Sequence, residues 1–234
     1  MGNKVRTIEL CVESAEDARL GVGLGVDRIE LCRELQCGGL TPSLPEIMDS
    51  LEMYPPQGLR ILVRQNPTSF ILSAGEINGI VDEVTFLRTE TFGKEPVGAP
   101  PAGFVVGAIT DTGNLDPTVL NRFRTAAGDR PLTFHRAFDQ VKDQQTALEM
   151  LIDAGFESVL TTGGDPSQAN PKQLEKLVSW ADGRIEILAS GGLRSNNVRE
   201  ITAAANVTAV HMRAPGQDGQ TSRTEVSNIL GALR

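Results

Sequence analysis

The feature that most constrains the fold is a regular alternation of two patterns along the chain. Short apolar runs rich in β-branched residues alternate with longer stretches of helical periodicity, and we count eight such pairs in 234 residues. The predicted strands are Thr7–Glu13, Arg28–Cys32, Arg60–Arg64, Phe104–Thr110, Pro131–Ala137, Ser158–Thr162, Ile185–Ser190 and Ala209–Arg213. The predicted helices lie near 15–24, 43–53, 74–92, 117–127, 143–154, 172–181, 195–205 and 222–233. This pattern predicts the α/β class, as a single (β/α)8 TIM barrel over residues 1–234.

An open, doubly wound sheet is the alternative fold. It usually carries a glycine-rich nucleotide loop after its first strand, whereas the first predicted strand is followed by Ser14. The glycines at 21–25 follow the first helix and therefore indicate a helix end. Predicted helix caps agree with the assignment; the N-caps are Ser14, Asp116 and Ser195, and the glycines just past helix ends are Gly128, Gly155 and Gly183. The proline- and glycine-rich segment 93–101 is predicted to be a surface loop.

Charge and hydropathy exclude two classes of partner. The net charge is −8 and no dense basic run occurs, so we expect no nucleic acid. No stretch reaches the roughly 18–20 apolar residues of a membrane helix, and the N-terminus lacks the apolar region of a signal peptide. We therefore expect no membrane association and a cytoplasmic protein. The three cysteines form no Cys-x-x-Cys pair, so free thiols are expected.

Strand parity predicts a polar barrel interior. Alternate strand residues face the barrel axis or the surrounding helices, and the apolar set should face the helices. The side chains then predicted to face the axis, or to follow strand ends at the mouth, are Glu9, Cys11, Glu13, Glu30, Cys32, Arg64, Thr133, His135, Ala137, Thr162, Ser190, His211 and Arg213. For Glu9 we favour a structural ion pair with Arg60 or Arg64, because buried charges must be paired.

The remaining polar groups predict a pocket at the carboxyl ends of the strands. Glu30 and His135 are candidate general acid/base residues, and Arg64 and Arg136 are candidate contacts for an anion. Asp139 is a further catalytic candidate; it could cap the following turn or orient His135.

A second candidate anion site follows the seventh predicted strand. Ser190, Gly191 and Gly192 leave backbone N–H groups unobstructed before a helix, and Thr162 and His211 are expected nearby. The alternative is a tight turn that merely needs glycine.

Three motifs resemble those of the CutC family of copper homeostasis proteins. They are Ile29–Cys32, Gly38–Ser43 and Thr133–Asp139, in this order and spacing, and the resemblance spans nearly the whole chain. It implies a cytoplasmic (β/α)8 barrel, often a homo-oligomer, associated with copper. The segment 63–70 departs from the family's Ile-Arg-Pro-Arg and Gly-Asp-Phe pattern, keeping only one arginine and the phenylalanine. Arg213, two residues after His211, is a cation that the family pattern lacks.

Copper binding is one hypothesis that follows. Cu(I) prefers two or three soft ligands, and Cys11 and Cys32 share inward parity on adjacent predicted strands. Buried cysteines are more often inert small hydrophobic residues. Glu30 with both histidines would instead suit a harder divalent metal, although no metal-ligand spacing motif supports it.

Three function classes therefore remain open. The first is a copper homeostasis protein that binds Cu(I). The second is an enzyme acting on a small anionic metabolite that bears a phosphate or a carboxylate. The third is a structural or partner-binding barrel.

Overall fold

The barrel predicted from the sequence is confirmed. In the computed structural model, which describes residues 4–92, 98–164 and 166–234, parallel strands close into one barrel in sequence order. The predicted loop at 93–101 falls partly on residues 93–97, which lie outside the described residues. The strands are β1 (Thr7–Val12), β2 (Arg28–Leu31), β3 (Leu59–Leu62), β4 (Gly103–Val106), β5 (Leu132–Phe134), β6 (Ser158–Thr161), β7 (Glu186–Ala189) and β8 (Ala209–Met212).

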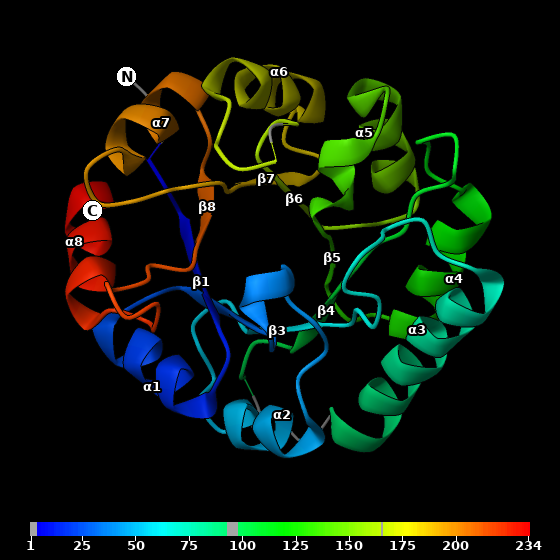
Figure 1. Cartoon of the computed structure of the whole chain (residues 1–234), viewed down its shortest axis with the longest axis horizontal. Coiled ribbons are helices and arrows are strands. Elements are labelled where there is room, and N and C mark those ends of the chain that lie inside the picture. Colours follow the sequence, from blue (N-terminus) through cyan, green and yellow to red (C-terminus); the bar gives the residue numbers. More distant parts are fainter. Residues whose placement is uncertain (1–3, 93–97, 165) are drawn as a thin grey trace.

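Helices surround the barrel as an outer ring (Figure 1). They are α1 (Ala15–Leu24), α2 (Leu44–Leu51), α3 (Ala74–Phe86), α4 (Pro117–Ala127), α5 (Gln144–Asp153), α6 (Pro171–Ala181), α7 (Val198–Ala205) and α8 (Arg223–Leu233). Three short helical segments complete the described chain: η1 (Leu35–Cys37), the π-helical turn η2 (Leu87–Thr91) and η3 (Arg136–Gln140). In Figure 1 the short blue helix in front of the barrel centre is η1, so this segment lies over the barrel opening.

Some boundaries differ from the predicted ones for local reasons. The fifth predicted strand reached Ala137, but β5 ends at Phe134 because His135 caps η3, its Nδ1 accepting a hydrogen bond from the Ala137 amide. The seventh predicted helix began at 195, but α7 begins at Val198, and Ser195 instead donates hydrogen bonds to Glu225. The predicted N-caps at Ser14 and Asp116 are confirmed.

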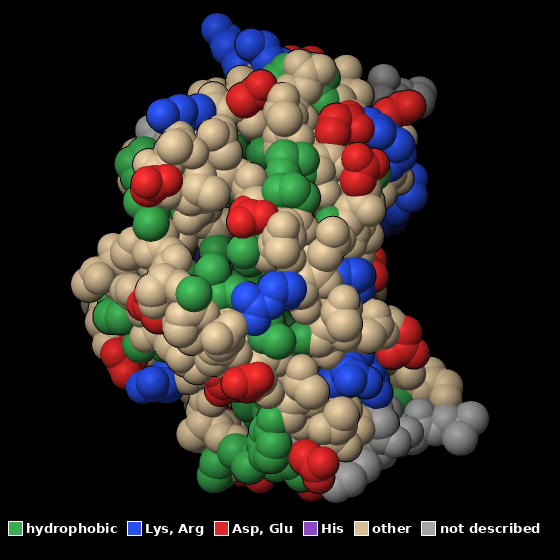
Figure 2. Space-filling view, turned by 90° about the vertical axis from the view of Figure 1, so that its right-hand side faces the viewer, with side chains coloured by type: hydrophobic (Ala, Val, Ile, Leu, Met, Phe, Trp, Pro, Cys, Tyr) green, Lys and Arg blue, Asp and Glu red, His purple; other side chains and the backbone are tan. Residues whose placement is uncertain are grey.

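The hydrophobic core lies between the strands and the helices. Outward-facing strand residues such as Leu10, Ile29 and Phe104 are fully buried there. On the face shown in Figure 2, acidic and basic side chains are interspersed with groups of hydrophobic side chains. Within the described chain, no helix is long and apolar enough to cross a membrane.

The inner face of the barrel holds a buried ionic network near its amino-terminal end. Glu9 accepts a hydrogen bond from the guanidinium of Arg28, which also donates to Glu186 at 2.9 Å. The prediction that Glu9 pairs with Arg60 or Arg64 is wrong. Strand register is the reason, because Glu9 of β1 lies directly beside Arg28 of β2. Arg60 instead donates to the backbone carbonyls of Leu59 and Pro101, and it pairs with no carboxylate among the described residues.

The buried pair predicts a large asymmetry between removing one partner and removing both. Arg28→Met should lower the free energy of unfolding by about 3–5 kcal/mol, because it leaves the carboxylate of Glu9 buried without its main cation. Adding Glu9→Gln should recover part of that loss, as measured by urea unfolding. The matched control is Arg184→Met, which breaks the exposed pair with Glu149 and should cost much less. Equal losses for the two arginine variants would contradict the argument.

Candidate functional site

A cavity of about 710 Å³ opens at the carboxyl ends of the strands. Of the residues predicted for the site, those that line it are Cys11, Glu30, Arg64, His135, Arg136, Asp139, Ser190, Gly191, Gly192 and His211. Cys32 and Thr162 do not line it. Both are fully buried, Cys32 behind Cys11 and Thr162 beneath Gly191. Most of the residues predicted for the site therefore line one cavity, as strand order and parity indicated.

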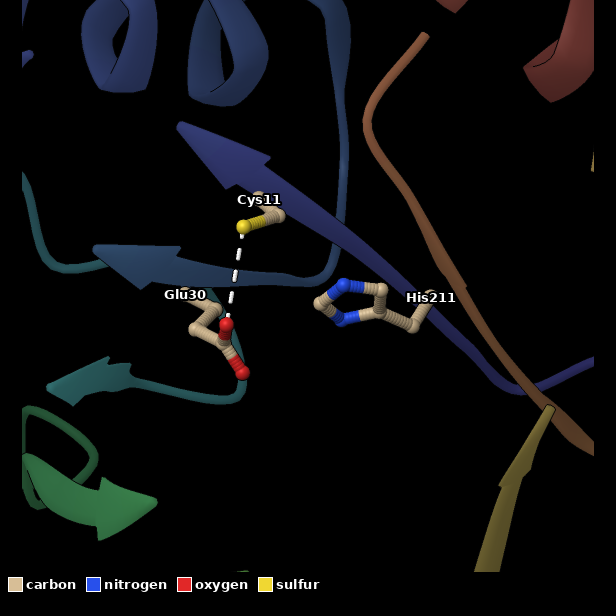
Figure 3. A group of neighbouring side chains, drawn as sticks. All are labelled: Cys11, Glu30 and His211. Atoms are coloured by element: carbon tan, nitrogen blue, oxygen red, sulfur yellow. Dashed lines mark hydrogen bonds between the residues drawn. The ribbon is translucent and has the colours of Figure 1, made fainter. Parts of the chain in front are cut away.

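Three side chains converge on the cavity floor (Figure 3). Cys11 comes from β1, Glu30 from β2 and His211 from β8, and one potential metal-binding atom from each lies within 4.8 Å of the others. The thiol of Cys11 donates to Oε1 of Glu30 at 3.5 Å. Sulfur, oxygen and nitrogen donors thus share one small space.

Glu30 is a buried carboxyl group with unused hydrogen-bonding capacity. Its Oε2 is buried and has no hydrogen-bond partner among the described residues. Burial raises the pKa of Glu30 to about 7, even though His211 acts in the opposite direction. Near neutral pH this group can therefore donate or accept a proton.

His211 is oriented by the same carboxylate that anchors the ionic network. Its Nδ1 lies 2.7 Å from Oε1 of Glu9, a carboxylate whose pKa is lowered to about 2 by Arg28 and His211 despite burial. Burial alone would lower the pKa of His211, but Glu30 and Glu9 raise it. The Glu9 contact leaves Nε2 as the ring nitrogen without a hydrogen bond within the described chain.

Cys11 of β1 and Cys32, the residue that follows β2, lie in direct contact. The Sγ atoms of Cys11 and Cys32 are 3.5 Å apart, and Cys32 also donates to the carbonyl of Val12. The Cys32 hydrogen bond and burial raise the pKa of Cys11 well above its usual value. The Cys11 sulfur is therefore a neutral thiol at physiological pH.

His135 is neutral and held rigidly. Burial and the nearby charge of Arg64 lower its pKa to about 3. Since Nδ1 accepts from the Ala137 amide, Nε2 carries the hydrogen. The ring packs 4.9 Å from that of Phe70, and a Cβ on Gly107 would come within 2.5 Å of it. His135 is thus arranged as a hydrogen-bond donor, which weighs against the predicted role as a general base.

Two roles were predicted for Asp139, capping the following turn or orienting His135. Its hydrogen bonds within the described chain support neither role. Its carboxylate accepts hydrogen bonds from Arg136, from the hydroxyl of Thr161 and from the amides of Thr162 and Gly164. The N-cap of α5 is Asp143. Asp139 therefore fixes the loop after β6, and a catalytic role for it stays a prediction.

Arg64 is largely committed to backbone carbonyls. Its Nη1 donates to Cys37 and Gly39 and its Nη2 to Pro67, and the guanidinium lies over the ring of Phe70 at 4.8 Å. Arg64 thereby holds η1 and the loop after β3 over the cavity. Only its buried Nε lacks a partner among the described residues, so the predicted anion contact stays a prediction.

Two functional features escaped the sequence argument. Arg194 lines the cavity, but no strand-parity rule applies to it because it lies in the loop after β7. The Glu9–His211 contact joins residues 202 positions apart, and only the closure of β1 on β8 brings them together. A register assignment for β1 and β8 could have found the contact.

Comparisons with known proteins point to one family. The family model described as CutC family matches residues 6–216. A copper homeostasis protein cutC homolog from Caenorhabditis elegans is 35% identical over 83% of this chain and 74% of its own length. A human protein of the same name is 33% identical over 88% of this chain and 72% of its own length. The crystal structure of CutC from Streptococcus agalactiae has a TM-score of 0.78 at 25% identity and covers 88% of this chain and 98% of that one.

The lowered pKa of His135 predicts a pH dependence of stability. Folded His135 has a pKa of about 3 against an ordinary 6.5, so below about pH 6.5 the unfolded state binds a proton that the folded state refuses. As the pH is lowered below this value, the free energy of unfolding should decrease, and His135 should contribute up to about 1.4 kcal/mol of this decrease per pH unit. Urea unfolding of the wild type and of His135→Asn should be measured between about pH 5 and 8. The pH-dependent part of the free energy of unfolding that His135 contributes should be absent in the variant. Parallel pH curves would contradict the assignment.

Proposed function

The chain belongs to the CutC family, and from this premise we propose that it acts in copper homeostasis by binding Cu(I) at the floor of the barrel mouth. The observation that carries the proposal is the contact between Cys11 and Cys32, whose sulfurs are 3.5 Å apart. Cu(I) favours soft thiolate ligands in small number, and these two sulfurs provide them.

The third ligand in this proposal is Nε2 of His211. Because Glu9 holds Nδ1, the other ring nitrogen is left for a metal, an arrangement common among metal-binding histidines. Metal–sulfur and metal–nitrogen bonds of about 2.0–2.3 Å require ligand atoms no more than ~4.6 Å apart. Donor atoms of Cys11, Glu30 and His211 lie within 4.8 Å of one another, which is close to that requirement. The Cys32 sulfur is not part of that group and lies 3.5 Å from the Cys11 sulfur.

The donor set favours Cu(I) over a harder divalent ion. Glu30 and His211 alone offer one oxygen and one nitrogen, and His135 does not join the Cys11, Glu30 and His211 group. A divalent site built from Glu30 and both histidines would need the buried ring of His135 to leave its contacts with Ala137 and Phe70. The sulfurs of Cys11 and Cys32 are already in contact, 3.5 Å apart.

The chemical state of the thiols is consistent with a reducing compartment. Cys11 and Cys32 are free and buried, and they bind metal only after losing their protons. We propose a cytoplasmic location, where such thiols stay reduced.

Replacing both cysteines tests the proposal directly. A competition titration against a chromophoric Cu(I) chelator, without oxygen, should give one Cu(I) per wild-type chain. Cys11→Ser with Cys32→Ser should weaken binding by at least about 100-fold. Cys37→Ser is the matched control, because this half-buried cysteine of η1 does not line the cavity. Unchanged affinity in the double variant would refute the site.

The histidine ligand has its own signature. X-ray absorption at the copper edge should show sulfur together with one nitrogen in the wild type and sulfur alone in His211→Gln. The affinity should fall by at least about 10-fold in that variant, because losing a ligand costs no less than losing a group that supports one. A wild-type spectrum with sulfur alone would remove His211 from the site while leaving the two cysteines in it.

A further inference from the structure

Copper at the floor would leave most of the cavity unused. A volume of about 710 Å³ is that of a small-molecule pocket, whereas the donor atoms at the floor enclose a space only a few ångströms across. One wall of the remaining space is the segment from Ser190 to Arg194, which follows β7. Every residue of this segment, which we call the β7 loop, lines the cavity.

The β7 loop presents three backbone donors that nothing in the described chain uses. The amide of Ser190 donates to the carbonyl of Thr161, and the amide of Arg194 donates to Asn197. Between them, the amides of Gly191, Gly192 and Leu193 make no hydrogen bond within the described residues. Successive amides left free in this way form an anion-binding concavity.

The loop can expose these amides only with glycine in its bend. Gly191 has a φ of 97°, and a Cβ there would come within 2.6 Å of the Thr162 side chain and 2.8 Å of the Ala169 amide nitrogen. The Gly191 carbonyl accepts from the Ala169 amide at 2.9 Å. The carbonyl is therefore used within the protein, whereas the three amides of this cavity-lining loop have no partner among the described residues.

A buried hydroxyl supports the same conclusion independently. The Ser190 side chain is 3% exposed, lines the cavity, and its Oγ has no hydrogen-bond partner among the described residues. A buried hydroxyl without a partner costs free energy unless something satisfies it. A ligand atom in the cavity would satisfy it.

The charge beside the loop is positive but partly balanced. Arg194 pairs through Nε with Glu225 at 3.0 Å and through Nη1 with the carbonyl of Pro215, which leaves Nη2 without a hydrogen bond within the described chain. Across the mouth, Arg136 pairs with Asp139, and Arg213 lies 3.9 Å from Glu13. Arg194, the last residue of the β7 loop, therefore adds one guanidinium nitrogen that is available for a ligand in the cavity.

We propose that the β7 loop binds the phosphate group of a small phosphate monoester whose organic part fills the cavity above Glu30. Three amides, one hydroxyl and one guanidinium nitrogen match a tetrahedral anion with several acceptor oxygens better than a planar carboxylate. The hydrogen on Nε2 of His135 and the unpartnered Oε2 of Glu30 offer one donor and one acceptor for hydroxyl groups of the organic part.

The test uses the metal-free full chain and two probes. Inorganic phosphate titrated by ³¹P NMR should bind saturably, and ribose 5-phosphate should bind more tightly, whereas ribose and acetate should not bind measurably. Ser190→Ala should weaken both phosphate probes by about tenfold or more, since it removes a hydrogen bond to a charged group. Arg194→Gln should weaken them as well.

Thr133→Ala is the matched control. Thr133 also carries a buried hydroxyl without a partner in the described chain, but it does not line the cavity, so phosphate binding should be unchanged. Because the phosphate probes are titrated into the metal-free chain, failure of this experiment is distinguishable from failure of the copper titration. Lack of saturable phosphate binding, or equal binding in Ser190→Ala and the wild type, would overturn the site. Ribose 5-phosphate binding no tighter than inorganic phosphate would overturn the place given to the organic part.

Discussion

The rest of the barrel interior depends on the pairing of the Glu9 carboxylate with Arg28 and His211. Register places Glu9 beside Arg28 on one neighbouring strand and beside His211 on the other. One oxygen accepts from the guanidinium and the other contacts the imidazole at 2.7 Å. A buried carboxylate needs this pairing to remain charged. The contact that helps keep Glu9 charged also fixes the His211 ring. The stability of the barrel and the geometry of the cavity floor therefore both depend on the Glu9 carboxylate.

The sequence was informative wherever one rule applied to one strand. Period-two alternation correctly predicted that four side chains face the barrel axis, namely Cys11, Glu30, His135 and His211. The rule succeeds because it needs only the residues of one strand at a time. It failed where an outcome depended on two strands at once. The partner of Glu9 is set by register, and a shift of one residue reverses every side chain. The apolar run alone does not define that register, so Arg60 and Arg64 were predicted as partners and Arg28 was missed.

The motif from His135 to Asp139 shows a different limit of sequence reasoning. Its residue types suggested acid, base and anion contact, but the backbone claims most of their capacity. His135 accepts from an amide two residues along, and Asp139 gathers donors from the loop after β6. Residue type indicates what a group can do, whereas the fold decides how much of that capacity is already used. The β7 loop is the converse case, because its free amides belong to no side chain and only the three-dimensional path of the backbone reveals them.

The two ligands that we propose can share one cavity because they use different atoms. The floor offers sulfur and imidazole nitrogen, donors that suit Cu(I). The β7 loop offers backbone N–H groups, which have no lone pair for a metal, and one serine hydroxyl, which is a hard oxygen that Cu(I) does not favour. Glu30 lies between the two sets, with one oxygen on the Cys11 thiol and the other unpartnered among the described residues. The soft donors of the floor and the donors of the β7 loop thus occupy different parts of one cavity, with Glu30 offering one oxygen, free among the described residues, to whatever fills the space between them.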